Sequence, residues 1–190
     1  MNGQAWHTNP GEQVAELAPD RFRRLSRIEL PVCLRWNRAA RWRGVRCLFQ
    51  IASRLGDGVF WYTLMAALLV HQGSSAIWPV LHMVAVGVLC TLIYKWLKDT
   101  TLRPRPYQAF SAIRVAMAPL DRFSFPSGHT LHAASFTLIA CHYYPALIPF
   151  LVPFSLLVAA SRLVLGLHYP SDVLAGAFIG GMVAALSLGL

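Results

Sequence analysis

Residues 161–172 read SRLVLGLHYPSD, an apolar stretch interrupted by four reactive side chains, Ser161, Arg162, His168 and Asp172. An arginine can neutralise phosphate oxygens, and a histidine six residues later can attack phosphorus. An acid four residues beyond it can hold the imidazole in the tautomer whose free nitrogen is the nucleophile. This order of side chains predicts phosphoryl transfer through His168.

An earlier segment, KDTTLRPRP at residues 98–106, supplies fixed positive charge. The Lys98 ammonium and the Arg105 guanidinium suit the three equatorial oxygens of a transferring phosphoryl group. Asp99 and Arg103 lie in the same segment and can pair with each other. The segment therefore predicts a phosphate-binding loop.

A third segment, PSGH at residues 126–129, opens the next apolar stretch. Ser127 and Gly128 can offer a hydroxyl and backbone N–H donors at a helix start, where unpaired amides and the helix dipole favour an anion. His129 can protonate the leaving oxygen and later activate water.

The three segments resemble the type 2 phosphatidic acid phosphatase family, membrane lipid phosphatases related to glucose-6-phosphatase and vanadium haloperoxidases. The family pattern is Lys, six residues, Arg-Pro; then Pro-Ser-Gly-His; then Ser-Arg, five residues, His, three residues, Asp. Every specified position is filled between Lys98 and Asp172. Agreement over three ordered motifs is far more specific than one short match.

The resemblance implies a role for each matching residue. Phosphate would be bound by Lys98, Arg105, Ser127, Gly128 and Arg162. His168 would be the nucleophile, His129 the acid and base, and Asp172 the partner that orients His168. The family needs no metal, so we expect no metal site and no cofactor.

Composition indicates an all-α integral membrane helical bundle, since 56% of the 190 residues are hydrophobic. We expect about five transmembrane helices, and a helix needs roughly 17–25 residues to cross the hydrocarbon core. Two of the predicted spans are shorter and must extend into their flanks. The spans are Val59–His71, Ile77–Trp96, Thr130–Tyr144, Ala146–Leu163 and Val173–Leu190.

Residues 1–57 differ from the transmembrane phosphatase domain expected at 58–190, because they carry ten arginines against five acids. Apolar residues and arginines alternate from Ile28 to Leu55, which predicts one amphipathic helix lying on the membrane surface. Its arginines would contact anionic lipids, and we expect no nucleic-acid binding. Residues 1–20 are expected to be poorly ordered.

Charge also bears on localisation, which we expect to be a bacterial inner membrane with the active site at the membrane surface. Five crossings would place the N-terminal arginines, the Lys98–Pro126 loop and His168 on one side. The opposite connections, Gln72–Ala76 and the turn near Pro145, carry no Lys or Arg, so the charge slightly favours a cytoplasmic site. Resemblance to bacterial relatives favours the periplasmic side, and a crossing through residues 31–52 would reverse the assignment.

The sequence thus predicts a lipid phosphatase acting on a phosphomonoester or pyrophosphate through a phosphohistidine. Undecaprenyl pyrophosphate, phosphatidylglycerol phosphate and phosphatidic acid are the candidate substrates, in that order. Alternatives are a vanadate-dependent haloperoxidase-like enzyme and a non-enzymatic membrane transport or scaffold protein. The sequence does not indicate an oligomeric state.

Overall fold

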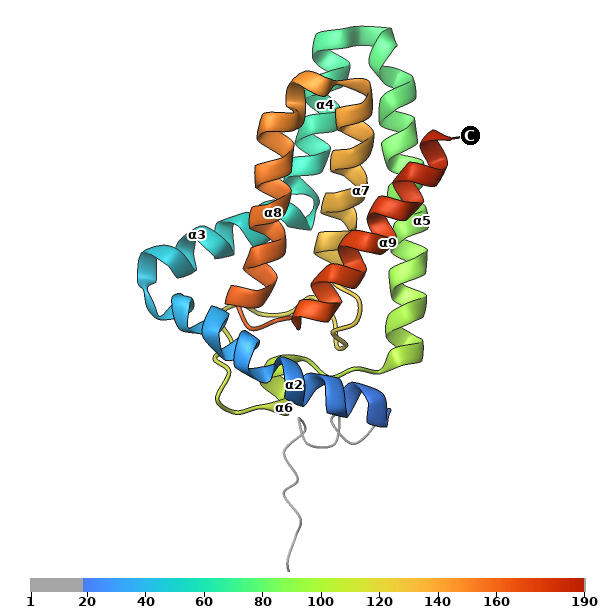
Figure 1. Cartoon of the computed structure of the whole chain (residues 1–190). Helices are drawn as coiled ribbons and strands as arrows, with labels where there is room; N and C mark the ends of the chain where they lie inside the picture. Colours follow the sequence, from blue (N-terminus) through green and yellow to red (C-terminus); the bar gives the residue numbers. More distant parts are fainter. Residues whose placement is uncertain (1–18, 190) are drawn as a thin grey trace, which may run out of the picture.

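A computed structural model describes residues 19–189, which form helices and connecting loops without strands (Figure 1). The prediction about residues 1–20 therefore lies almost wholly outside the described residues. The α-helices are α2 (Asp20–Asn37), α3 (Arg43–Arg54), α4 (Phe60–Gln72), α5 (Ile77–Thr101), α6 (Pro106–Ala109), α7 (Gly128–Tyr143), α8 (Ile148–Val164) and α9 (Pro170–Leu188). Short 3₁₀ or π segments occupy Arg38–Arg41, Leu55–Val59, Gly73–Ala76 and Pro145–Leu147.

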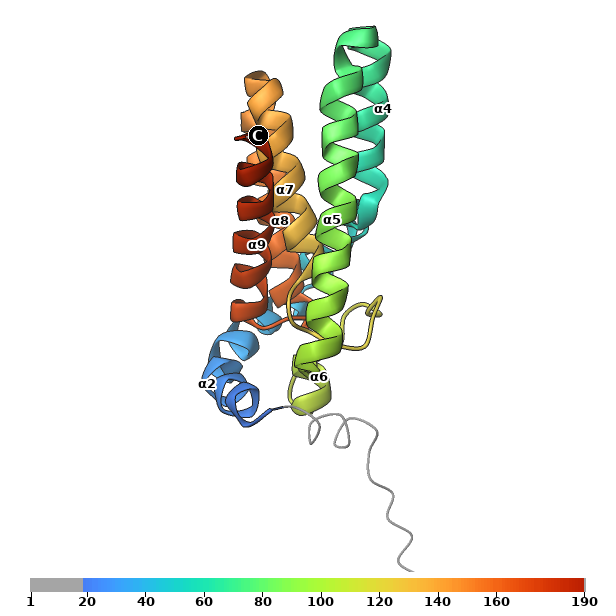
Figure 2. The ribbon, with the colours of Figure 1, turned by 90° about the vertical axis from the view of Figure 1, so that its right-hand side faces the viewer.

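Helices α4, α5, α7, α8 and α9 form the bundle, and each matches one of the five predicted apolar spans to within a few residues. Figure 2 shows α4 beside α5, with α7, α8 and α9 grouped together. Helix α7 packs against α5, α8 and α9. Its Leu131 and Ile139 are fully buried in one core with Met83 of α5 and Leu151 of α8. The all-α bundle predicted from composition is confirmed.

Three helical stretches are long and apolar enough to cross a membrane: Arg43–Ala109, Pro145–Val164 and Pro170–Leu188. The first contains both α4 and α5. Helix α7 has 16 residues, slightly below the roughly 17–25 needed for a full crossing. The chain is an integral membrane protein, and five crossings remain a prediction.

Glycines set the close approach of α9 to α7. A Cβ atom on Gly176 would lie 2.5 Å from the Ser127 carbonyl oxygen, and one on Gly180 would collide with the Leu131 carbonyl oxygen. Small residues four apart let two membrane helices approach backbone to backbone. This contact fixes the start of α7 beside the start of α9.

The prediction of one amphipathic helix over Ile28–Leu55 is wrong in its continuity. The chain forms α2 and α3, separated by a turn at 38–42; α2 lies across the lower end of the bundle, and α3 lies beside α8 (Figure 1). Buried Asn37 explains the break, because its Nδ2 donates to the carbonyls of Arg114 and Val164, each at 3.0 Å. These bonds tie the turn to the end of α8 and to the loop after α6. Trp42, just beyond it, is 75% exposed.

Candidate active site

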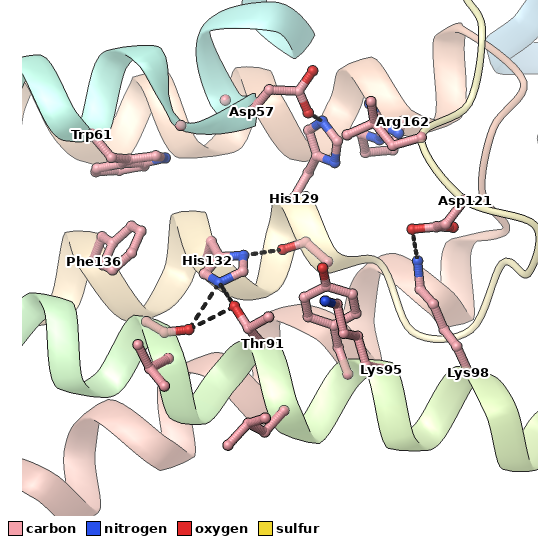
Figure 3. Close-up of a pocket in the computed structure, with 18 of the residues that line it drawn as sticks. Asp57, Trp61, Thr91, Lys95, Lys98, Asp121, His129, His132, Phe136 and Arg162 are labelled. Atoms are coloured by element: carbon pink, nitrogen blue, oxygen red, sulfur yellow. Dashed lines mark hydrogen bonds and ion pairs between the residues drawn. The ribbon is translucent and has the colours of Figure 1, made fainter.

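A cavity of about 760 Å³ opens at the end of the bundle where α5, α7 and α8 meet the long loop after α6. Six of the eight predicted site residues line it, and Figure 3 labels three of them. Ser127 and Asp172 are fully buried and are not among its lining residues. The six lining residues are Lys98, Arg105, Gly128, His129, Arg162 and His168.

Lys98 lies in the last turn of α5, which ends at Leu102 in the left-handed conformation, and Arg105 immediately precedes α6. The carboxylate of Asp121, from the following loop, joins the two cations. Its Oδ2 lies 2.5 Å from Lys98 Nζ and its Oδ1 lies 2.6 Å from Arg105 Nη2. Sequence reasoning did not include Asp121.

The charge of Asp121 follows from this pairing. Burial alone would raise the pKa of Asp121, but the Lys98 and Arg105 charges outweigh it and hold the pKa below its ordinary value. Asp121 is therefore ionised, and its oxygens contact the two cations that the sequence predicts as phosphate ligands.

His168 lies in the buried loop between α8 and α9, where its N–H donates to the Arg162 carbonyl at 3.1 Å. Arg105 Nη1 lies 3.3 Å from His168 Nε2. A guanidinium can only donate, so Nε2 must accept and carries the lone pair. The proton then lies on Nδ1, which is 3.5 Å from Asp172 Oδ2.

Burial first, and then the positive charges of Arg105, Arg162 and Lys98, lower the pKa of His168 well below its ordinary value. The imidazole is therefore neutral near pH 7. A neutral imidazole with its Nε2 lone pair toward the cations has the protonation state that a nucleophile requires.

Asp172 is held mainly by Arg103, so the predicted pairing of Arg103 with Asp99 is wrong. Arg103 Nη1 lies 2.6 Å from Asp172 Oδ1, and Arg103 Nη2 lies 2.6 Å from Glu29 Oε2 on α2. The guanidinium also stacks 3.9 Å from the centroid of the Tyr169 ring. A charge this deeply buried needs carboxylate partners, which the distant Glu29 and Asp172 provide and exposed Asp99 does not.

The start of α7 has the predicted backbone geometry, but the Ser127 side chain is not among the groups that line the cavity. Ser127 precedes the first helical residue, Gly128, and its backbone N–H donates to the Asp172 carbonyl at 3.0 Å. Its hydroxyl pairs with that of Thr130 at 2.9 Å rather than facing the cavity. The Gly128 backbone, at a helix end that has unpaired amides, remains the predicted anion donor here.

Two further contacts come from the segment before α4. His129 Nε2 lies in close contact with Asp57 Oδ1, and Arg162 Nη1 donates to Ser53 Oγ (Figure 3 shows the Asp57 contact). Arg162 Nε is buried without a hydrogen-bond partner among residues 19–189. Asp57 was also missed, although an acid flanked by Gly56 and Gly58 at the start of an apolar run is a visible signal.

Known proteins share this architecture. The mouse (Mus musculus) sphingosine-1-phosphate phosphatase 2 is 32% identical over 151 residues, covering 74% of this chain and 41% of the relative. The chain thus spans about two fifths of that relative's length. The undecaprenyl-diphosphatase of Sulfolobus acidocaldarius is 25% identical, covering 85% of this chain and 76% of the relative.

A solved structure, LpxE of Aquifex aeolicus, superposes with a TM-score of 0.75 and 26% sequence identity, covering 86% of this chain and 96% of that one. The model of the PAP2 superfamily matches residues 76–190, more than half of the chain and all three motifs. The chain therefore belongs to the PAP2 superfamily, the type 2 phosphatidic acid phosphatases.

Proposed function

We propose that this chain is a phosphatase that hydrolyses a phosphomonoester or pyrophosphate on a membrane lipid through a phosphohistidine at His168. One observation carries the proposal: the three cations and two histidines of the motifs line a single cavity at the end of a membrane helix bundle. Such a cavity can hold a phosphate, a nucleophile and a proton donor together.

The proposed reaction has two steps. His168 Nε2 attacks phosphorus while the bond to the leaving oxygen breaks, and His129 donates a proton to that oxygen. Water then attacks the phosphohistidine while His129 takes a proton, so inorganic phosphate leaves and His168 returns to its neutral state. Lys98, Arg105 and Arg162 stabilise the charge on the phosphoryl oxygens throughout.

The cavity also supports a lipid rather than a water-soluble ester. Beyond the charged end its lining is largely apolar, contributed by Trp61, Met65, Val84, Val88, Leu92 and Phe136. A tail can stay among these side chains while the headgroup reaches the histidines. Undecaprenyl pyrophosphate, phosphatidylglycerol phosphate and phosphatidic acid remain the candidates in that order, and the similarity to an undecaprenyl-diphosphatase supports the first.

Metal independence and membrane orientation belong to this proposal. The three cations supply the charge that a divalent ion would otherwise bring. We also propose that α2 and α3, in the described part of the basic region 1–57, lie on the membrane surface against anionic lipids. The exposed Ile28 and Trp42, at 73% and 75%, suit that position beside the arginines. The site would then open toward the same side, slightly favoured as cytoplasmic.

Phosphate release from the purified protein in detergent tests the proposal, with a panel of lipid phosphates and pyrophosphates. We expect release to persist in chelator and to be inhibited by vanadate, which mimics the trigonal-bipyramidal transition state. No release from any lipid would favour a transport or scaffold role. Halide oxidation with vanadate and peroxide, without phosphate release, would favour the haloperoxidase alternative. Loss of release in chelator with recovery in Mg²⁺ would contradict metal independence.

A further inference from the structure

Asp57 reaches the cavity because the chain departs from regular α-helix between α3 and α4. Residues Leu55–Val59 form a π-helical turn in which Gly58 has φ 125°. A Cβ atom on the neighbouring Gly56 would lie 2.9 Å from Val158 Cγ1 on α8, so this turn is packed tightly. π-turns inside helices occur frequently at functional sites. The turn carries an acidic side chain into a cavity that the motif cations also line.

The contact of Asp57 is with His129, the group that the proposed function assigns to proton transfer. Asp57 Oδ1 lies against His129 Nε2, and both side chains are mostly buried, at 22% and 10% exposure. A carboxylate can only accept when ionised, so His129 Nε2 must carry the proton in this contact. His129 Nδ1 is then the nitrogen that exchanges protons with the substrate and water.

Electrostatics explain why His129 needs such a partner. Lys98, Arg105 and Arg162 line the same cavity, and positive charge near an imidazole disfavours its protonated form. A general acid must hold a proton before the reaction begins. The Asp57 carboxylate offsets the nearby cations and stabilises the imidazolium that can protonate the leaving oxygen.

We propose that Asp57 is a positioning residue for His129, fixing its tautomer and stabilising its protonated form. The inference rests on the proposed phosphatase function and deepens it. Asp57 lies outside the three motifs and outside residues 76–190, the part of the chain that the superfamily model matches. The catalytic unit of this chain then includes a carboxylate partner for each of the two histidines, Asp57 for the proton carrier His129 and Asp172 for the nucleophile His168.

The test compares Asp57→Asn with a matched variant, Asp99→Asn. Asp99 also lines the cavity, but it forms no ion pair among the described residues. A general acid contributes typically about 10²–10⁴-fold, so Asp57→Asn should lower turnover of a lipid phosphate at least about 10-fold. With an aryl phosphate, whose leaving oxygen needs little protonation, phosphoenzyme formation should change less than about 3-fold. Asp99→Asn should match the wild type with both substrates.

Normal phosphoenzyme formation by Asp57→Asn also shows that the variant is folded. An equal loss with both substrates, or no loss with either, would overturn the inference. In a His129→Ala background, adding Asp57→Asn should cause no further loss of lipid-phosphate turnover, and a further loss of about 10-fold would count against coupling. A wild type that releases no lipid phosphate would instead overturn the proposed function, and the inference with it.

Discussion

Replacing Gly176 by alanine should separate α9 from α7 and reduce activity without changing the side chain of any site residue. The new Cβ atom would lie 2.5 Å from the Ser127 carbonyl oxygen, whereas ordinary contacts begin near 3.4 Å. The helices must therefore move apart by about 1 Å, because the obstacle is backbone, and overpacking of this kind typically costs about 1–3 kcal/mol. The strain falls on the start of α7, which carries His129.

The magnitude for activity follows from the same displacement. A misplacement of about 1 Å in a catalytic arrangement can cost about 10²-fold in rate. Gly176→Ala should thus lower turnover by about 10- to 100-fold and reduce the free energy of unfolding by about 1–2 kcal/mol, after the alanine's better helix propensity is included. Phosphate release and unfolding in increasing sodium dodecyl sulfate measure the two effects.

Gly181 provides the matched control on the same helix, since a Cβ atom there meets nothing within 4 Å. Gly181→Ala should retain full activity and be equally stable or more stable by about 0.5–1 kcal/mol. If Gly176→Ala behaves like Gly181→Ala, the close approach of α9 to α7 does not position the site, and our reasoning about this contact is refuted.

Three other predictions address chemistry and topology. His168→Ala should form no phosphoenzyme with any leaving group, whereas His129→Ala should form it with an aryl phosphate and dephosphorylate slowly. Acid-quenched samples with radiolabelled substrate distinguish the two variants. Label trapped on His168→Ala would mean that the roles of the two histidines are assigned wrongly. Because the pKa of His168 is lowered, its neutral form persists as pH falls. The acid limb of the pH–rate profile for phosphoenzyme formation should therefore lie below pH 6.5, and an acid limb above that pH would contradict a neutral nucleophile. In a variant without native cysteines, an external thiol reagent should label Ser74→Cys but not Gln108→Cys in intact cells, and labelling of Gln108→Cys alone would place the site outside.

The helices were predictable because their signal is local. Each of the five apolar runs became a bundle helix, and the three motifs fell at helix ends or in loops as their Pro and Gly residues indicated. The break between α2 and α3 was not predictable from that pattern. The break depends on hydrogen bonds from Asn37 to Arg114 and Val164, which lie 77 and 127 positions further along the chain. Hydrophobic periodicity carries no information about such distant partners.

The same limit explains what was missed in the site. Motif spacing located six residues that share the cavity, but it gave Arg103 a partner from its own segment. Its actual partners, Glu29 and Asp172, are 74 and 69 residues away. A buried guanidinium is stable only where tertiary packing delivers carboxylates, and proximity in sequence says little about which carboxylates those are.

Charge balance offers a signal that motif reading did not use. The chain has eight acidic residues, and a low-dielectric cavity that holds the three motif cations and two motif histidines requires counter-charge. Asp121 pairs with two of the cations, Asp57 contacts His129, and Glu29 shares Arg103 with Asp172. In a membrane protein with so few acids, the motif cations and histidines have few carboxylates available as partners. Each acid beside an apolar run is therefore a candidate partner for them.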